Sequence, residues 1–174
     1  VLPVSGLTYT WTPPSACFAP TVQATNLQLI PASTSQTNGS FTAATGADSY
    51  VVVRTTDGTL SENPVDGTTY SGGNALGNGI VVQSDIASIF SASGLTNGVA
   101  YFFHVFAMNS QCTGGPLYYT NSPLSGSAYT LPNTPTSMSA TATGTSSIEL
   151  SAVSTQPVLI AYNTTKTFGT PTGS

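Results

Sequence analysis

Charged side chains are scarce in this sequence. Only 5% of its residues are Asp, Glu, Lys or Arg, against about 25% in a typical soluble domain. The basic residues are Arg54 and Lys166 alone. Nucleic acids and anionic membrane surfaces are bound through clusters of Lys and Arg, so the composition argues against both as partners. Ser and Thr are abundant, and we expect their hydroxyl groups, rather than charges, to hydrate the protein surface.

Long hydrophobic runs are also missing. No run approaches the ~20 apolar residues of a membrane-spanning helix, so we expect no membrane insertion. The first residues lack the basic start and apolar centre of a signal peptide. If the protein is exported, we expect its signal to have been removed or to lie upstream. Enough aromatic and branched apolar residues remain to build a core, so disorder is not expected.

Helical periodicity is absent too, and short β-rich runs alternate with Gly, Pro, Asn and Asp clusters. This pattern indicates an all-β protein. Seven strands are predicted in about 110 residues, the number typical of an immunoglobulin-like β-sandwich. Their ranges are Thr25–Ile30, Gly39–Ala43, Ser49–Thr55, Gly79–Ser84, Ala87–Ala92, Ala100–Met108 and Leu124–Thr130.

Parts of the sequence occur twice. Residues 3–10, PVSGLTYT, match residues 123–130, PLSGSAYT, at five of eight positions. Near the other end, Pro135-Thr136 echoes Pro20-Thr21, and residues 146–152 and 158–165 echo the second and third predicted strands. These repeats predict tandem sandwiches in three pieces. Residues 1–16 are the last strand of a preceding repeat with a Pro-rich linker, 17–131 are a complete sandwich, and 132–174 are the first strands of a following, incomplete repeat.

An incomplete sandwich leaves an apolar sheet face and open edges exposed. One explanation is that the chain is a window of a longer array, so that residues 132–174 are completed in cis. The other is that a second chain completes them by donating a strand. We favour the window, because a donated segment 1–10 would fill only one gap and three more strands would still be missing.

Two stretches carry a family resemblance. Residues 94–109, GLTNGVAYFFHVFAMN, are similar to the penultimate strand region of fibronectin type III domains, and the spacing of Leu95 and Tyr101 fits a tyrosine corner. Residues 50–82 and 106–130 resemble the fibronectin type III-like repeats of very large secreted proteins of Bacteroidota. The resemblance implies surface display, spacing and adhesion, with neighbouring repeats as partners. It implies no catalytic activity and no cofactor.

Cysteine occurs only at positions 17 and 112. In an exported protein a single disulfide is the simplest expectation. It would link the segment before the first strand to the loop before the last one. The alternatives are two free thiols or a metal-binding pair, and the latter lacks neighbouring His or Cys ligands.

The strand at 101–108 is apolar on both faces. Alternation places one set of its side chains on a second face, away from the core: Phe102, His104, Phe106 and Met108. Either the long 56–78 loop covers this face, or it is an exposed stripe that contacts a neighbouring domain or subunit. His104 is the only histidine, and its surroundings in the sequence do not suggest a catalytic base.

Three acidic residues, Asp57, Glu62 and Asp66, lie in or beside the long loop. They are a weak candidate for a Ca²⁺ site, but Asp-Gly pairs are ordinary turn formers. No metal is otherwise expected. Glycoside hydrolysis by the same carboxylates would need a cleft with sugar-stacking aromatic residues around them.

Sugar attachment and sugar binding remain open. Asn38 and Asn163 match the N-glycosylation pattern, and Ser49 is a candidate for O-glycosylation. Three aromatic residues are candidates for stacking on sugars: Trp11, Tyr118 and Tyr119. Both interdomain segments, 11–20 and 131–135, contain several prolines, which favours stiff linkers.

Taken together, these features predict a non-enzymatic, extracellular structural or adhesive protein, as part of a cell-surface stalk, fibre or filament. The alternative is a carbohydrate-binding or adhesion module attached to a larger secreted enzyme or adhesin. The expected partners are copies of the chain or neighbouring repeats, and glycans in the alternative.

Overall fold

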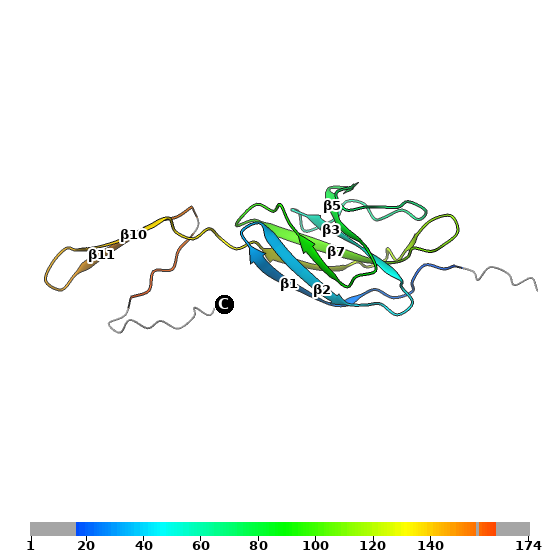
Figure 1. The fold of residues 1–174 in the computed structure, drawn as a ribbon, viewed down its shortest axis with the longest axis horizontal. Helices are drawn as coiled ribbons and strands as arrows, with labels where there is room; N and C mark the ends of the chain where they lie inside the picture. The colour runs from blue at the N-terminus through cyan, green and yellow to red at the C-terminus, as the bar shows by residue number, and fades with distance from the viewer. Residues whose placement is uncertain (1–16, 156, 163–174) are drawn as a thin grey trace, which may run out of the picture.

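A computed structural model describes residues 17–155 and 157–162 (Figure 1). All regular structure in this part of the chain is β, arranged as a two-layer sandwich followed by a separate hairpin. The all-β sandwich predicted from the turn and strand pattern is thus confirmed. In the described ranges no helix has the length and apolarity needed to cross a lipid bilayer.

The first layer is a three-stranded antiparallel sheet in the order β1-β2-β6, with β1 at Thr25–Ser33, β2 at Gln36–Thr42 and β6 at Ile89–Ala92. Along β1, exposed and partly buried residues alternate, as expected when only one face of a sheet is covered. Leu27 and Leu29 point to the covered side and pack against the core.

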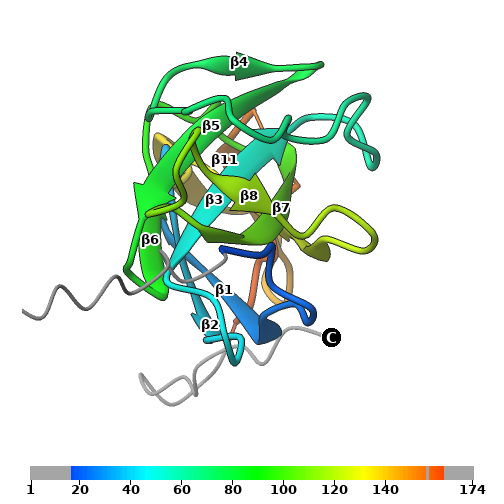
Figure 2. The same cartoon turned by 90° about the vertical axis from the view of Figure 1, so that its right-hand side faces the viewer.

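The second layer has the order β4-β5-β3-β7-β8, and β9 also pairs with β7. Figure 2 shows β1 and β2 in one layer, β3, β7 and β8 in the other, and β4 beyond β5. All seven predicted strands are present, and the sequence pattern missed only the two-residue strands β4 and β8. The bounds in this layer are β3 Ser49–Thr55, β4 Ala75–Leu76, β5 Gly79–Asp85, β7 Ala100–Asn109, β8 Leu117–Tyr118 and β9 Leu124–Tyr129.

The main core lies between the two sheets. β3 contributes Tyr50 and Val52, β7 contributes Phe103 and Val105, and Phe90 reaches in from β6. Each is 5% exposed or less, and burying side chains of this size stabilises the fold by roughly 1.5–3 kcal/mol each. The alternation of β7 therefore places Phe103 and Val105 where the sequence predicts them.

A second apolar cluster lies on the other side of the β3–β7 sheet. Its centre is Phe106 of β7, and Leu60 and Tyr70 of the long loop pack against it. The 56–78 segment thus forms a third, irregular layer over part of this sheet. This explains why β3 and β7 are apolar on both faces, because a strand covered on both sides has no solvent face.

After β9 the chain runs through residues 131–136 into the hairpin of β10 (Ser137–Ala142) and β11 (Ile148–Val153). Figure 1 shows this hairpin beyond the end of the sandwich. Residues 157–162 contain no strand, although the echo of the third strand falls at 158–165. The three-part division of the chain stays a prediction, and residues 1–16 and 163–174 of it lie outside the described residues.

Candidate functional site

The apolar second face of β7 is buried inside the chain. Phe106, Met108 and His104 are at most 4% exposed, and Phe102 is partly exposed. For Phe106, Met108 and His104 the exposed-stripe interpretation is therefore wrong. The second cluster covers Phe106 and Met108, and the 56–78 loop reaches Phe102 through Gly58. The alternative interpretation, a face covered by the long loop, describes Phe106 and Met108, because Leu60 and Tyr70 of that loop pack against their cluster.

His104 sits between β3 and β9. Its Nδ1 is 3.0 Å from the Ser125 hydroxyl oxygen, and its Nε2 has no hydrogen-bond partner among the described residues. Burial lowers the pKa of His104 below its usual value of 6.5, because desolvation disfavours the imidazolium. Burial thus favours the neutral form of the single histidine, which lies in a packed layer.

The three acids of the long loop are not gathered into a site. Asp66 accepts a hydrogen bond from the backbone N–H of Tyr118 at 2.8 Å, and Asp57 accepts one from the amide of Asn78 at 3.3 Å. The described part of the chain contains no group of three or more His, Cys, Asp or Glu side chains placed to hold a metal. The described residues therefore do not form the predicted calcium site. Asp66 and Asp57 instead bond to neighbouring loop segments.

Of the candidate sugar-stacking residues, the two that the structure describes are not exposed platforms. Tyr118 is 4% exposed, donates its hydroxyl to the Thr68 carbonyl at 2.7 Å and packs edge-on against Tyr70. Burial, with Tyr70 and Asp66 nearby, raises the pKa of Tyr118 to about 12. Tyr119 is partly buried against the main core, and Trp11 lies outside the described residues. Stacking on a sugar needs a free ring face, which Tyr118 does not have.

The candidate attachment sites differ from one another. Asn38 is exposed on β2, where its side-chain oxygen accepts a hydrogen bond from Gln36. Ser49 is 3% exposed and donates to the Ser110 hydroxyl at 3.2 Å, so its burial argues against O-glycosylation there. Asn163 lies outside the described residues.

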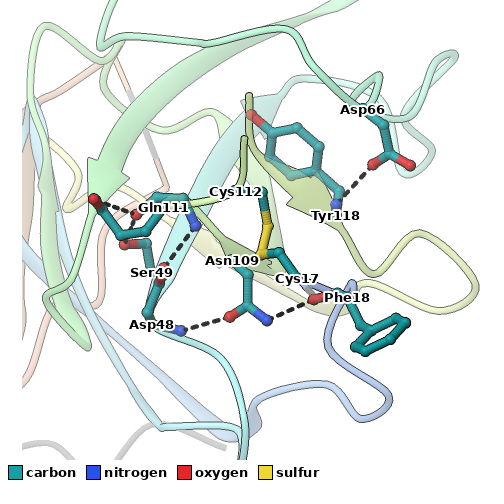
Figure 3. Close-up of a disulfide and its surroundings, with 10 residues drawn as sticks. Cys17, Phe18, Asp48, Ser49, Asp66, Asn109, Gln111, Cys112 and Tyr118 are labelled. Atoms are coloured by element: carbon teal, nitrogen blue, oxygen red, sulfur yellow. Dashed lines mark hydrogen bonds between the residues drawn. A yellow bond between two sulfur atoms is a disulfide. The ribbon is translucent and has the colours of Figure 1, made fainter. Parts of the chain in front are cut away.

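The disulfide predicted from the two cysteines is present between Cys17 and Cys112, whose Cα atoms are 5.4 Å apart. Figure 3 shows it beside Asn109, whose side chain ties two segments together. Asn109 donates to the Phe18 carbonyl at 2.7 Å and accepts from the Asp48 backbone N–H at 3.2 Å. The chain is therefore anchored where it enters the sandwich, at the Asn109 end of β7.

The other end of β7 marks where the chain leaves the sandwich. Tyr129 pairs with Ala100, and the Leu131 backbone N–H donates to the Ser33 carbonyl at 3.1 Å. Entry and exit thus lie at opposite ends of the longest strand, as Figure 1 shows. This arrangement suits domains that follow one another in a line.

The hairpin presents an extended apolar surface. Directly opposed residues of an antiparallel pair share a face, and the pairs Met138–Ala152, Ala140–Leu150 and Ala142–Ile148 are all apolar. We call these six residues the hairpin apolar face. The other face carries Ser137, Ser139, Thr141, Glu149, Ser151 and Val153.

The hairpin apolar face is largely uncovered. Met138 is 68% exposed and Ile148 67%, and only Ala152 is partly buried. A hollow of about 470 Å³ lies beside it, lined by Ile148, Leu150 and Tyr162 among others. Sequence reasoning predicted strands here but did not identify this face. The signal was the alternation of Met138, Ala140 and Ala142, facing that of Ile148, Leu150 and Ala152.

Comparison with known proteins gives a fold likeness only. No family model and no curated protein matches the chain. Solved structures that resemble it include FN3tt (15% identity over 66% of this chain and 98% of that chain, TM-score 0.45). Others are the fn3 domain of human contactin 1 (18%, 76% and 97%, TM-score 0.45) and an FN3 domain of human collagen XX (20%, 67% and 100%, TM-score 0.40). At these values the fold assignment rests on strand order and pairing. The hydrogen bond from the Thr96 N–H to the Tyr101 hydroxyl oxygen, the predicted tyrosine corner, supports it.

Proposed function

We propose that this chain is part of an extracellular structural or adhesive protein in which β-sandwich domains follow one another end to end. The observation that carries the proposal is the hairpin that begins directly after the sandwich. A two-stranded hairpin is only marginally stable alone in water, so β10 and β11 belong to a further β unit. The chain enters and leaves the sandwich at opposite ends, so successive units would follow one another in a line.

Three features support a mechanical role outside the cell. The Cys17–Cys112 disulfide closes a segment of 95 residues, and such bonds persist in oxidising compartments. Pro132 and Pro135 stiffen the connection between sandwich and hairpin. Low charge leaves few Lys and Arg sites for trypsin-like proteases. The resemblance to repeats of secreted Bacteroidota proteins agrees with surface display as a stalk, fibre or filament.

The proposal includes no catalytic role and no cofactor. The one histidine is a buried neighbour of Ser125, and the acids of the long loop bond to backbone and amide groups. A carbohydrate-binding module, the other candidate from the sequence, has no specific support in the described residues, because Tyr118 is buried and Tyr119 is partly buried against the core.

Electron microscopy of the native material tests the proposal. Long fibres with a regular repeat along their axis are the expected result, and gold-labelled antibodies against residues 17–131 should mark them at that repeat. Isolated compact particles that carry the label would contradict it. Saturable binding of the purified chain on a glycan array, reduced by Tyr119→Ala but not by Tyr129→Ala, would favour the carbohydrate-binding alternative.

A further inference from the structure

We propose that residues 1–10 of a second copy of this chain dock on the hairpin apolar face, so that copies join head to tail. This inference rests on the proposed function and names the partner that its exposed hairpin takes. It identifies both the surface, on β10 and β11, and the segment that covers it.

The first argument is the surface itself. Six apolar side chains lie side by side on one face of the hairpin, while the opposite face carries four hydroxyls and a carboxylate. Apolar area buried from water contributes roughly 25 cal/mol per Å². A contiguous exposed face of this kind marks an interaction site. Its chemistry calls for an apolar β segment without charge.

The second argument comes from the complete sandwich, where the equivalent surface packs on the core between the sheets and β9 covers the part of it that lies on β1. Gly126 of β9 lies so close to β1 that a Cβ added there would be 3.1 Å from Leu27 and 3.4 Å from Leu29. β10 follows Pro135-Thr136 as β1 follows Pro20-Thr21. The hairpin therefore has the counterpart of β1, and no described strand acts for it as β9 acts for β1.

The third argument identifies the occupant. Residues 3–10 match residues 123–130, which include all of β9, at five of eight positions, and Gly6 stands where Gly126 stands. Gly126 is the residue that permits the close approach to Leu27 and Leu29. The segment 1–10 contains no charged side chain, so docking it against apolar residues buries no charge.

Chain reach argues that this segment comes from another copy. The disulfide holds Cys17 near the Asn109 end of β7, and the hairpin lies beyond the Ala100 end. The ten residues of β7 cover about 30 Å. Thr10 precedes Cys17 by seven residues, which span at most about 25 Å when fully extended. Thr10 therefore cannot reach the hairpin of its own chain.

The resulting contact is heterologous: one copy offers its N-terminal segment and the next offers its hairpin. Such contacts propagate into open chains unless a rotation closes them into a ring. Entry and exit at opposite ends of the sandwich favour an open line. The docked segment adds one strand, and the sandwich of the partner stays intact.

A complementation experiment tests the proposal on the full chain. One variant lacks residues 1–10 and keeps the hairpin, and the other carries Leu150→Glu and keeps the segment. Sedimentation velocity is measured for each variant alone and for their equimolar mixture. Ser151→Glu is the matched control, because it adds the same charge to the same strand on the opposite face. Thermal unfolding shows whether the sandwich is intact in every variant.

We expect the wild type and Ser151→Glu to associate with rising concentration, and each of the two other variants to stay monomeric. Their mixture should give a complex of about twice the mass of one chain and nothing larger, because only one productive contact remains. Association of the variant that lacks residues 1–10 would overturn the proposal, since hairpins would then be pairing with each other. A wild type that stays monomeric, or a mixture without a complex, would overturn it as well.

A direct measurement covers the case in which Leu150→Glu disturbs the hairpin. The synthetic peptide VLPVSGLTYT should bind the variant that lacks residues 1–10 in calorimetry, and a scrambled peptide should not. Absence of peptide binding contradicts the inference. It leaves the proposed function standing if native fibres are seen, because the array would then be continuous along longer chains. Compact particles in the native material would contradict the proposed function, whether or not the peptide binds.

Discussion

The hydroxyl oxygen of Tyr101 accepts a hydrogen bond from the backbone N–H of Thr96 at 3.0 Å. Tyr101 begins the central run of β7 and Thr96 lies in the loop before it, so this bond is the tyrosine corner that the sequence spacing predicts. Leu95, next to Thr96, is buried in the main core. The bond therefore fixes the crossing from the first sheet to the second.

Removing this bond should destabilise the sandwich. Tyr101→Phe keeps the ring, which is 4% exposed, and leaves the Thr96 N–H without its acceptor. Because Thr96 is exposed, water can take the place of the lost acceptor. We therefore expect the free energy of unfolding to fall by about 0.5–1.5 kcal/mol, the usual net contribution of one hydrogen bond. Urea denaturation followed by fluorescence measures it. Tyr129→Phe is the control, because that side chain is 67% exposed, and an equal loss in both variants would contradict the assignment.

The buried His104 should make stability depend on pH. Its folded-state pKa is lowered from 6.5 by burial, so the unfolded chain binds a proton at a higher pH than the folded one. Stability should therefore be unaffected well above pH 6.5 and should fall as the pH drops below it, levelling off under the folded-state pKa. The measurement is urea denaturation between neutral and mildly acidic pH.

The variant His104→Gln isolates this effect. Glutamine does not titrate and keeps a donor and an acceptor near Ser125. Carboxylates contribute equally to the pH dependence of both proteins. Below pH 6.5 the unfolding free energy of the wild type should therefore fall relative to that of the variant. Parallel stability curves for the two proteins would show that His104 is not the group responsible.

Much of the sandwich was predictable because its strands follow period-two alternation bounded by turn residues. β3, at Ser49–Thr55, matches its predicted range, and β7 extends one residue further. Local pattern does not reveal β4 and β8, because strands of two residues carry no periodicity. Their place is set by tertiary contacts, such as the bond from the Tyr118 N–H to Asp66.

The site residues were harder to predict because burial depends on segments far apart in sequence. Tyr118 looked like an exposed loop aromatic, and only Thr68 and Tyr70, some fifty residues away, make it a buried one. Ser49 is likewise buried, and its hydroxyl bonds to Ser110, which is 61 residues away in the sequence. The sequence alone could not show that this candidate attachment site is covered. Cys17 and Cys112 were predictable because two cysteines allow only one intramolecular pairing.

The disulfide should contribute a large share of the stability of the sandwich. In the chain-entropy model, closing a loop of 95 residues is worth about 4–5 kcal/mol. We expect Cys17→Ser with Cys112→Ser to lower the unfolding free energy by that order. Guanidinium denaturation of the wild type with and without reductant should show the same difference. A reduced wild type as stable as the oxidised one would contradict the expectation.

The close approach of β2 and β6 supplies the sharpest packing prediction. A Cβ added to Gly39 would lie 2.0 Å from the ring of Phe90, its partner across the β2–β6 pair. Gly39→Ala therefore cannot be accommodated without moving that ring, and we expect a loss of about 1–3 kcal/mol, the usual cost of overpacking. Phe90→Ala alone should cost about 3–5 kcal/mol through the cavity it leaves.

The double variant decides whether these two losses share one cause. With the ring gone, the added methyl group has space, so Gly39→Ala should cost little in the Phe90→Ala background. The two single losses should then exceed the loss in the double variant. Urea denaturation of all four proteins gives the coupling free energy. Strict additivity would mean that Gly39 is needed for its backbone rather than for the space that the ring of Phe90 occupies.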